Sequence, residues 1–167
     1  MQPGPILAGR TLECTVSSVF MSVLLAVLHV VSGVFIVGPM AILPMIGLRA
    51  LRSRQPAQVA ALAKLVTVFT LLSLVVVFFG FGALGMSGPG SDYSFASTWI
   101  WLSLVLYVIA VALDLFVVVP ALRSAAQSLE VGTADGGRAA GYSRISAGSG
   151  TVALLLVVIV VLMVWKP

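Results

Sequence analysis

The chain has 167 residues, of which 60% are hydrophobic and 8% are charged, and its formal net charge is +4. A soluble domain carries about 25% charged residues, so this chain lacks the polar side chains needed to coat a soluble globule. The composition therefore predicts an integral membrane protein. Nucleic acid is excluded as a partner, because the chain has no clusters of basic and aromatic residues that would grip phosphates and stack bases.

The first 17 residues precede any long apolar segment, and we expect them to form a flexible tail. Cys14 is the only cysteine, which excludes an internal disulfide and any metal site built from several cysteines. Met21 opens the apolar run MSVLLAVLHV, so translation could start at either Met1 or Met21, and the sequence leaves both open.

A transmembrane helix needs about 20 consecutive apolar residues. Four segments meet this requirement, at about residues 18–39, 65–85, 98–122 and 146–165. We expect the straight part of the first span to end near Pro39, because proline removes a backbone donor. The prediction is an all-α fold, an up-down transmembrane four-helix bundle that forms a single membrane domain over residues 18–167. No repeat unit is evident along the chain.

The distribution of cations predicts how the chain is threaded through the membrane. Cytoplasmic connections collect Lys and Arg. The first and third connections hold the topology-setting cations Arg49, Arg52, Arg54, Lys64, Arg123, Arg138 and Arg144, whereas the second connection holds none. Both termini are therefore expected on the extracytoplasmic side, where Trp99, Trp101 and Trp165 would lie at the interface.

Small and polar residues mark the faces on which membrane helices pack, since lipid is as apolar as leucine. Two such faces repeat at helical spacing: Ser22, Ala26, His29 and Gly33 in the first span, and Ser103, Tyr107, Ala110 and Asp114 in the third. The second span shows a looser stripe of hydroxyls, Thr67, Thr70 and Ser73. His29 and Asp114 are thus expected to point into the bundle. Counted from the span ends, His29 lies level with either Tyr107 or Asp114, and both partners stay open.

His29, Tyr107 and Asp114 form a candidate intramembrane polar site, because ionisable residues inside a membrane are functional candidates. The structural interpretation is hydrogen bonding between helices. One alternative is a b-type haem with His29 as a ligand of its iron. A methionine could supply the second ligand, but no methionine matches the depth of His29, so haem held within one chain is disfavoured. A haem shared by two copies, with one His29 from each, stays open. Another is a proton or ion path through His29, Tyr107, Asp114 and the hydroxyls of the second span. We expect no metal site and no other cofactor.

Enzymatic hydrolysis is not indicated, because the chain has no second histidine, no HExxH, no GxSxG and no paired carboxylates in its spans. We therefore expect no catalytic residues and no enzyme.

The stretch MSVLLAVLHVVSGVFIVGPMAILPMIGLRALR, with Leu28, His29, Gly33, Gly38 and Pro39, resembles the opening of an uncharacterised family of small bacterial four-span membrane proteins. These are known only as predicted integral membrane proteins, and the family is distantly similar to the membrane domain of copper-resistance protein D. That domain carries further histidines and methionines that are absent here, so copper handling is not implied. The resemblance implies a multi-pass protein of the bacterial plasma membrane.

These observations favour an interaction role, in which the chain is an accessory or structural subunit that packs against another membrane protein or against a second copy. A haem-binding or proton-handling bundle centred on His29 is the alternative. A small transporter ranks third, because the spans show neither broken helices at mid-membrane nor inverted repeats.

Overall fold

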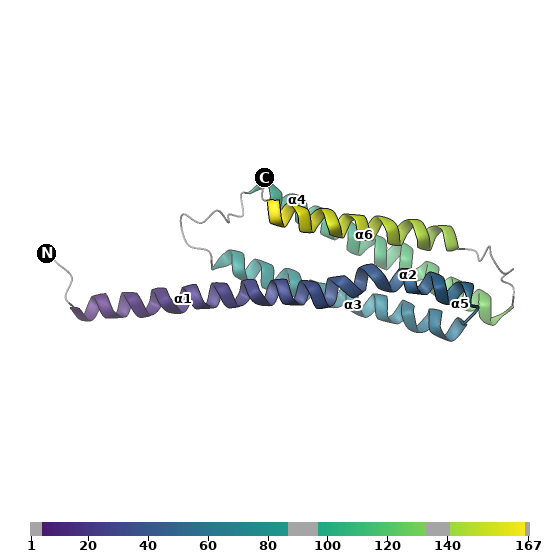
Figure 1. Ribbon diagram of the computed structural model, residues 1–167, viewed down its shortest axis with the longest axis horizontal. Coiled ribbons are helices and arrows are strands. Elements are labelled where there is room, and N and C mark those ends of the chain that lie inside the picture. The colour runs from purple at the N-terminus through teal and green to yellow at the C-terminus, as the bar shows by residue number, and fades with distance from the viewer. Residues whose placement is uncertain (1–4, 87–96, 133–140, 166–167) are drawn as a thin grey trace.

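The computed structural model describes the backbone of residues 5–86, 97–132 and 141–165, and the side chains of these ranges from Val16 onward. Within these ranges the secondary structure is helical, and four helices are long and apolar enough to cross a membrane (Figure 1). The elements in chain order are α1 (Pro5–Ser32), η1 (Gly33–Val37), α2 (Gly38–Arg52), α3 (Pro56–Gly85), α4 (Thr98–Leu113), η2 (Asp114–Val118), α5 (Val119–Glu130) and α6 (Tyr142–Trp165).

The first span is a continuous helix from Pro5 to Arg52, so the expectation that it ends near Pro39 is wrong. The reason lies in η1, a wide π-helical turn that comes immediately before α2. Pro39 is near the start of α2, and the wider turn ahead of it accommodates the ring and the missing N–H donor. The helix also begins at Pro5, although a flexible tail was expected through residue 17. The connection to α3 shortens to residues 53–55.

The third span follows the same plan, because η2 precedes Pro120, near the start of α5, and the helix continues to Glu130. The third and fourth spans are longer than the apolar runs that predicted them, and so is α3, which begins at Pro56. The polar ends of these helices carry the chain past the hydrocarbon, since about 20 residues suffice to cross it.

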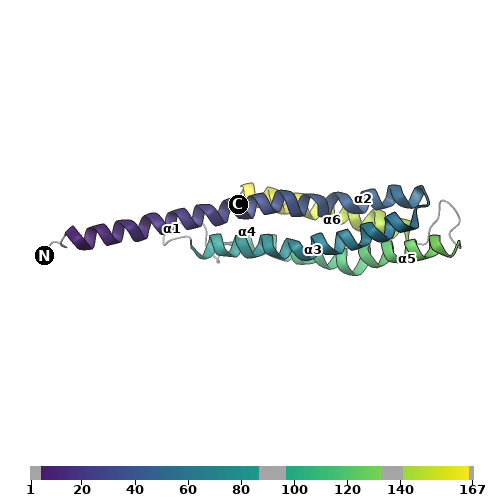
Figure 2. The same ribbon diagram turned by 90° about the horizontal axis from the view of Figure 1, so that it is seen from below.

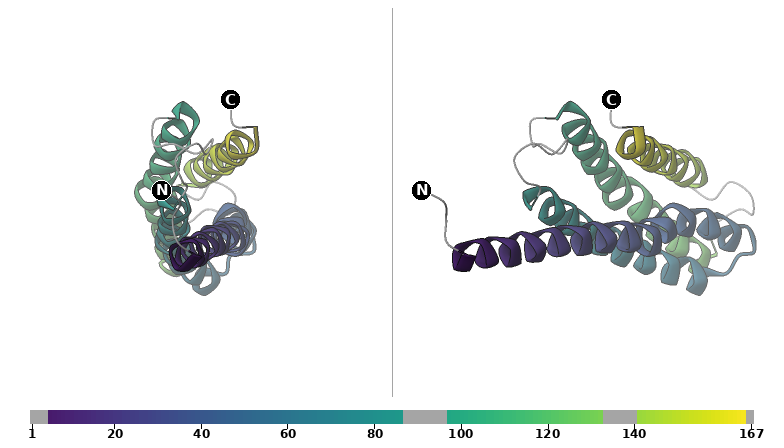
Figure 3. Two further views of the ribbon diagram at one scale, coloured as in Figure 1. Left: turned by 90° about the vertical axis from the view of Figure 1, so that its left-hand side faces the viewer. Right: turned by 60° about the vertical axis from the view of Figure 1, so that its left-hand side comes forward.

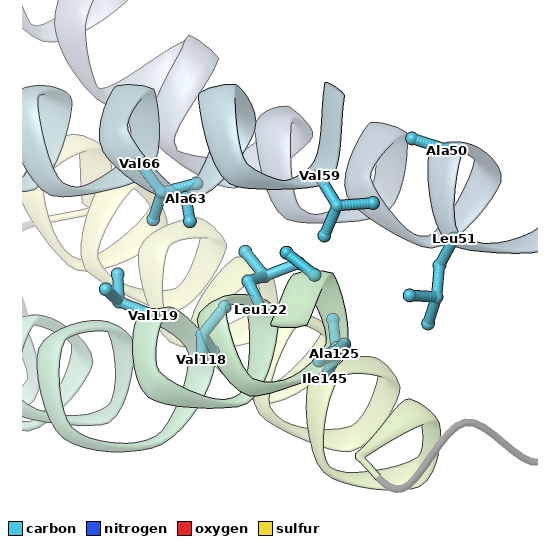
Figure 4. Packing of buried hydrophobic residues seen from close by; sticks show 11 residues of the cluster. Ala50, Leu51, Val59, Ala63, Val66, Val118, Val119, Leu122, Ala125 and Ile145 are labelled. Carbon is cyan, nitrogen blue, oxygen red and sulfur yellow. The ribbon is translucent and has the colours of Figure 1, made fainter. Parts of the chain in front are cut away.

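At the end where α2 passes into α3, the elements α2, α3, α5 and α6 close around one hydrophobic cluster (Figure 4). Leu122 of α5 is fully buried at its centre, and Gly47 of α2 lies against it: a Cβ at Gly47 would come within 2.9 Å of Leu122 Cδ2. Glycine therefore lets the first and third spans approach closely across the bundle.

Toward the opposite end the packing separates into two pairs, α1 on α3 and α4 on α6, and the pairs diverge (Figures 1 and 3). At this end α1 projects past the other helices (Figure 2). A second cluster fills the region where the pairs still meet; its buried members are Met40, Tyr107, Ala110, Val152, Leu156 and Ile159. We call the half around Leu122 the closed half and the diverging half the open half.

The described cations of the predicted cytoplasmic connections all lie in or next to the closed half and are exposed: Arg49, Arg52, Arg54, Lys64, Arg123 and Arg144. Arg138 lies outside the described residues. Arg52 donates a hydrogen bond to the hydroxyl of Tyr142, and its guanidinium lies 5.3 Å from the centroid of that ring. This cation–π contact joins the first and fourth spans at the closed end.

Candidate functional site: a buried polar seam along α3

The predicted packing face of the third span is buried. Ser103, Tyr107, Ala110 and Asp114 follow one another along α4 into η2, and their exposed fractions are 3%, 9%, 0% and 0%. They repeat at helical spacing, so one side of the helix carries all four side chains toward the interior. Three of the four are polar, and α3 supplies partners for two of them.

Tyr107 is hydrogen-bonded to Ser73 of α3, with 2.6 Å between the two hydroxyl oxygens. Ser73 Oγ also donates to the carbonyl of Thr70, at 2.6 Å. Because a serine hydroxyl has a single hydrogen, Tyr107 must be the donor in the bond to Ser73. The direction of the chain is therefore Tyr107 to Ser73 to the backbone of Thr70.

Asp114, the first residue of η2, is fully buried and accepts a hydrogen bond from Thr70 Oγ1 at Oδ2, at 3.2 Å. Its other oxygen, Oδ1, is buried and has no hydrogen-bond partner among the described residues. The same holds for Ser103 Oγ. Buried polar atoms are almost always paired, so these two atoms are exceptions that need a physical explanation.

His29 meets α3 as well, but further toward the open half. Its Nδ1 lies 2.7 Å from the carbonyl oxygen of Val76, and since a carbonyl only accepts, Nδ1 carries the hydrogen and donates it. In the neutral ring this leaves Nε2 with a free lone pair. The imidazole covers Gly80, where a Cβ would come within 2.9 Å of Cε1. The partner of His29 is thus the second span, and neither Tyr107 nor Asp114 fills that role.

The first span contributes one buried residue, Met40, to the cluster that holds Tyr107 and Ala110, and its partly buried Val37 and Ala41 pack against that cluster. The count from the inner span ends, which set His29 level with Asp114, was wrong because the first span does not stop at Pro39. Since the helix continues to Arg52, His29 is displaced along the helix toward the open half, and Met40 takes its expected place.

The predicted packing face of the first span is only partly observed. Gly33 lies near Val76 of α3, since a Cβ at Gly33 would come within 3.8 Å of Val76 Cγ1. Ala26 is exposed, and Leu25 contacts Gly82 in its place. Ser22 donates to the carbonyl of Val19 within its own helix. The first span therefore contacts α3 through Leu25, His29 and Gly33.

The structure brings together two parts of the predicted polar site and sets the third apart. Asp114 and Tyr107 meet α3 at Thr70 and Ser73, and His29 meets it at Val76, at the next turn. Thr70 and Ser73 belong to the loose stripe noted in the sequence. Together with Tyr107 and Asp114 they form what we call the seam, the buried polar side chains along α3. The described residues hold no group of three or more His, Cys, Asp or Glu side chains suited to a metal ion.

Replacing Gly80 by alanine is expected to displace the partly buried His29 from Val76 and to lower the free energy of unfolding by about 1 kcal/mol, the net contribution of one hydrogen bond. Ring nitrogen shifts of His29 in NMR spectra and unfolding in mixed micelles would measure both effects. Gly85→Ala is the matched control on the same helix, because a Cβ there meets nothing within 4 Å. Equal effects of the two substitutions would contradict the contact.

Comparison with known proteins places the chain by sequence alone. Residues 23–167 match the family described as predicted integral membrane protein (DUF2269). No curated protein and no solved structure matches the chain.

Proposed function

Since this chain belongs to the DUF2269 family of predicted integral membrane proteins, we propose that it is a non-enzymatic multi-pass subunit of the bacterial plasma membrane, with both termini on the extracytoplasmic side. In this role it packs against a larger membrane protein or against a second copy. The observation that carries the proposal is the length of α1, which continues past the helix that supports it.

The register between α1 and α3 fixes where this support ends. Leu25 lies against Gly82, and His29 lies against Gly80. The two helices run antiparallel, so the last residue of α3, Gly85, lies opposite about residue 23. Residues 5–22 of α1 therefore extend about 27 Å beyond α3, at about 1.5 Å per residue.

An apolar stripe begins in the described part of this extension and continues along α1 beside α3. Its members recur at helical spacing and are 51–67% exposed: Val16, Val19, Phe20, Val23 and Val27. The apolar run of α3, residues 65–85, is about as long as the hydrocarbon is thick, and it lies opposite residues 23–43 of the first span. With the hydrocarbon centred on this run of α3, Val16, Val19 and Phe20 lie outside it, where exposed apolar surface is costly and a protein partner would cover it.

Photocrosslinking in native membranes tests this proposal. A benzophenone amino acid at Phe20, which is 67% exposed, is expected to give one defined protein adduct, and an adduct of twice 17.4 kDa would identify a second copy. Phe78 of α3, which is 72% exposed within the lipid-facing run, is the matched control and is expected to capture lipid only. If position 20 also captured lipid only, the subunit role would be wrong.

The geometry of His29 favours a second candidate, a haem-binding or proton-handling bundle. Histidines that bind metals commonly donate their other N–H to a carbonyl or carboxylate, and the bond to Val76 has this form. An absorption spectrum of protein purified from its own host would test it. A Soret band that is lost in His29→Ala supports this candidate, and a colourless protein removes the haem. Transport, the third candidate, requires substrate-dependent flux in liposomes.

A further inference from the structure

The first and third spans share two blocks of sequence. Residues 27–31 read VLHVV and residues 105–109 read VLYVI, so His29 and Tyr107 occupy matching positions. Further along, FIVGP at 35–39 matches FVVVP at 116–120. The separation between the blocks is three residues longer in the third span, and Asp114 lies in this longer stretch.

The backbone repeats with the sequence. Each block that ends in proline overlaps a five-residue π-helical turn, η1 or η2, and each turn ends two residues before its proline. The residue four positions before each proline is a phenylalanine on the exposed side, Phe35 at 72% and Phe116 at 79%. A proline cannot donate to the carbonyl four residues earlier, which explains why both helices widen at this point.

The packing repeats as well. In the open half each odd span packs on the helix that follows it, α1 on α3 and α4 on α6, and each π-helical turn also packs on that helix. In the closed half the hairpins also pack on each other, with α2 on α6 and α5 on α3, while α2 keeps its packing on α3 and α5 packs only slightly on α6. Even the buried serines correspond, since Ser73 and Ser149 both donate to the carbonyl three residues earlier.

We infer that the protein consists of two copies of one helical hairpin, joined in the closed half, and that the Tyr107–Ser73 hydrogen bond is a latch that holds their open halves together. The first hairpin contains α1, η1, α2 and α3, and the second contains α4, η2, α5 and α6. Tyr107 and Ser73 are on different hairpins and both are buried, and Tyr107 belongs to the second cluster, in the region where the hairpins still meet.

The physical basis of the latch is the absence of a hydrophobic force between helices in lipid. In the closed half, tight van der Waals packing joins the hairpins, but beyond Tyr107 the helices pack mainly within their own hairpin. A buried hydrogen bond between hairpins then decides whether the open halves stay together. Thr70–Asp114 adds a weaker bond at the π-helical turn, at 3.2 Å.

Electron–electron distance measurements on the full chain in nanodiscs test the latch. Cys14 is first replaced by serine, and spin labels are placed at exposed positions of both hairpins. One pair reports on the open half, Phe78 with Val164, and the other on the closed half, Gln58 with Ser143. Tyr107→Phe and Ser73→Ala are each expected to raise the share of long distances in the first pair roughly three- to thirty-fold, the range that one hydrogen bond between membrane helices supplies. The second pair should not change.

Ser149→Ala is the matched control, because this buried serine bonds only within its own helix and should leave the first pair unchanged. The double variant of Tyr107 and Ser73 should act like either single variant, since all three remove the same bond. Three results would overturn the latch: additive effects in the double variant, an unchanged first pair in both single variants, or an equal loosening of the two labelled pairs.

Discussion

Replacing Leu122 by alanine is expected to destabilise the fold by about 2–3 kcal/mol, the lower part of the range known for buried leucines. The side chain is fully buried where α2, α3, α5 and α6 meet, so no single helix can move to fill the space that alanine leaves. The lower part applies because lipid is as apolar as the core, and only packing is lost. Unfolding in mixed micelles, followed by tryptophan fluorescence, measures the change.

Gly47 provides a sharper test of the same contact. In the native chain Gly47→Ala should destabilise the bundle, because the new methyl group would lie 2.9 Å from Leu122 Cδ2. In the Leu122→Ala background the same methyl group fills part of the cavity, so the sign of its effect should reverse. Leu154→Ala, at a position 65% exposed on α6, controls for shortening a leucine in lipid. An unchanged sign in the two backgrounds would show that the residues do not share this space.

The sequence predicts the number of spans and the buried face of the third span, because both depend on local patterns. Apolar runs longer than about 20 residues mark helices that can cross a membrane. Ser103, Tyr107, Ala110 and Asp114 repeat at helical spacing, and a helix that stays regular over three turns must place them on one side. Nothing between Thr98 and Leu113 interrupts that helix.

The partner of His29 could not be predicted, because it depends on the register between spans. That register was counted from the assumed ends of the spans, one of them at Pro39, yet a π-helical turn carries the helix through this proline. Gly80, opposite His29, is one sequence feature that could have indicated the partner span, since a small residue there leaves room for an imidazole. In FFGFGALG, however, Gly80, Gly82 and Gly85 compete for that role, and only the packing of α1 on α3 selects Gly80.

The relation between the two hairpins was missed for a different reason. Chains rich in Val and Leu match one another by composition, so the short blocks around His29 and Tyr107 carry little signal by themselves. The three-residue difference between the blocks also removes a constant period, which is what reveals repeats in a sequence. Two π-helical turns, each followed by a proline, make the correspondence recognisable.

Replacing Asp114 by leucine is expected to raise the free energy of unfolding by about 1–3 kcal/mol. Oδ1 is buried without a partner, and leaving such an atom unpaired costs about that amount. Leucine has the same branching as aspartate and no polar atom, and exchanging a buried polar group for an apolar one of the same shape can be nearly neutral or stabilising. The hydroxyl of Thr70, which donates to Oδ2, can instead bond to a carbonyl of its own helix. The same micelle titration measures the gain.

Asp114→Asn distinguishes the effect of the carboxylate from the effect of having any polar side chain at this position. Asparagine keeps an acceptor for Thr70 but adds two buried donors, so it should be less stable than Asp114→Leu. If leucine stabilises the fold, the carboxyl group of Asp114 destabilises it relative to an apolar side chain. The presence of Asp114 in the seam then indicates a function other than packing. If leucine instead destabilises the fold by more than about 1 kcal/mol, Oδ1 has a partner in the membrane, and the seam is structural.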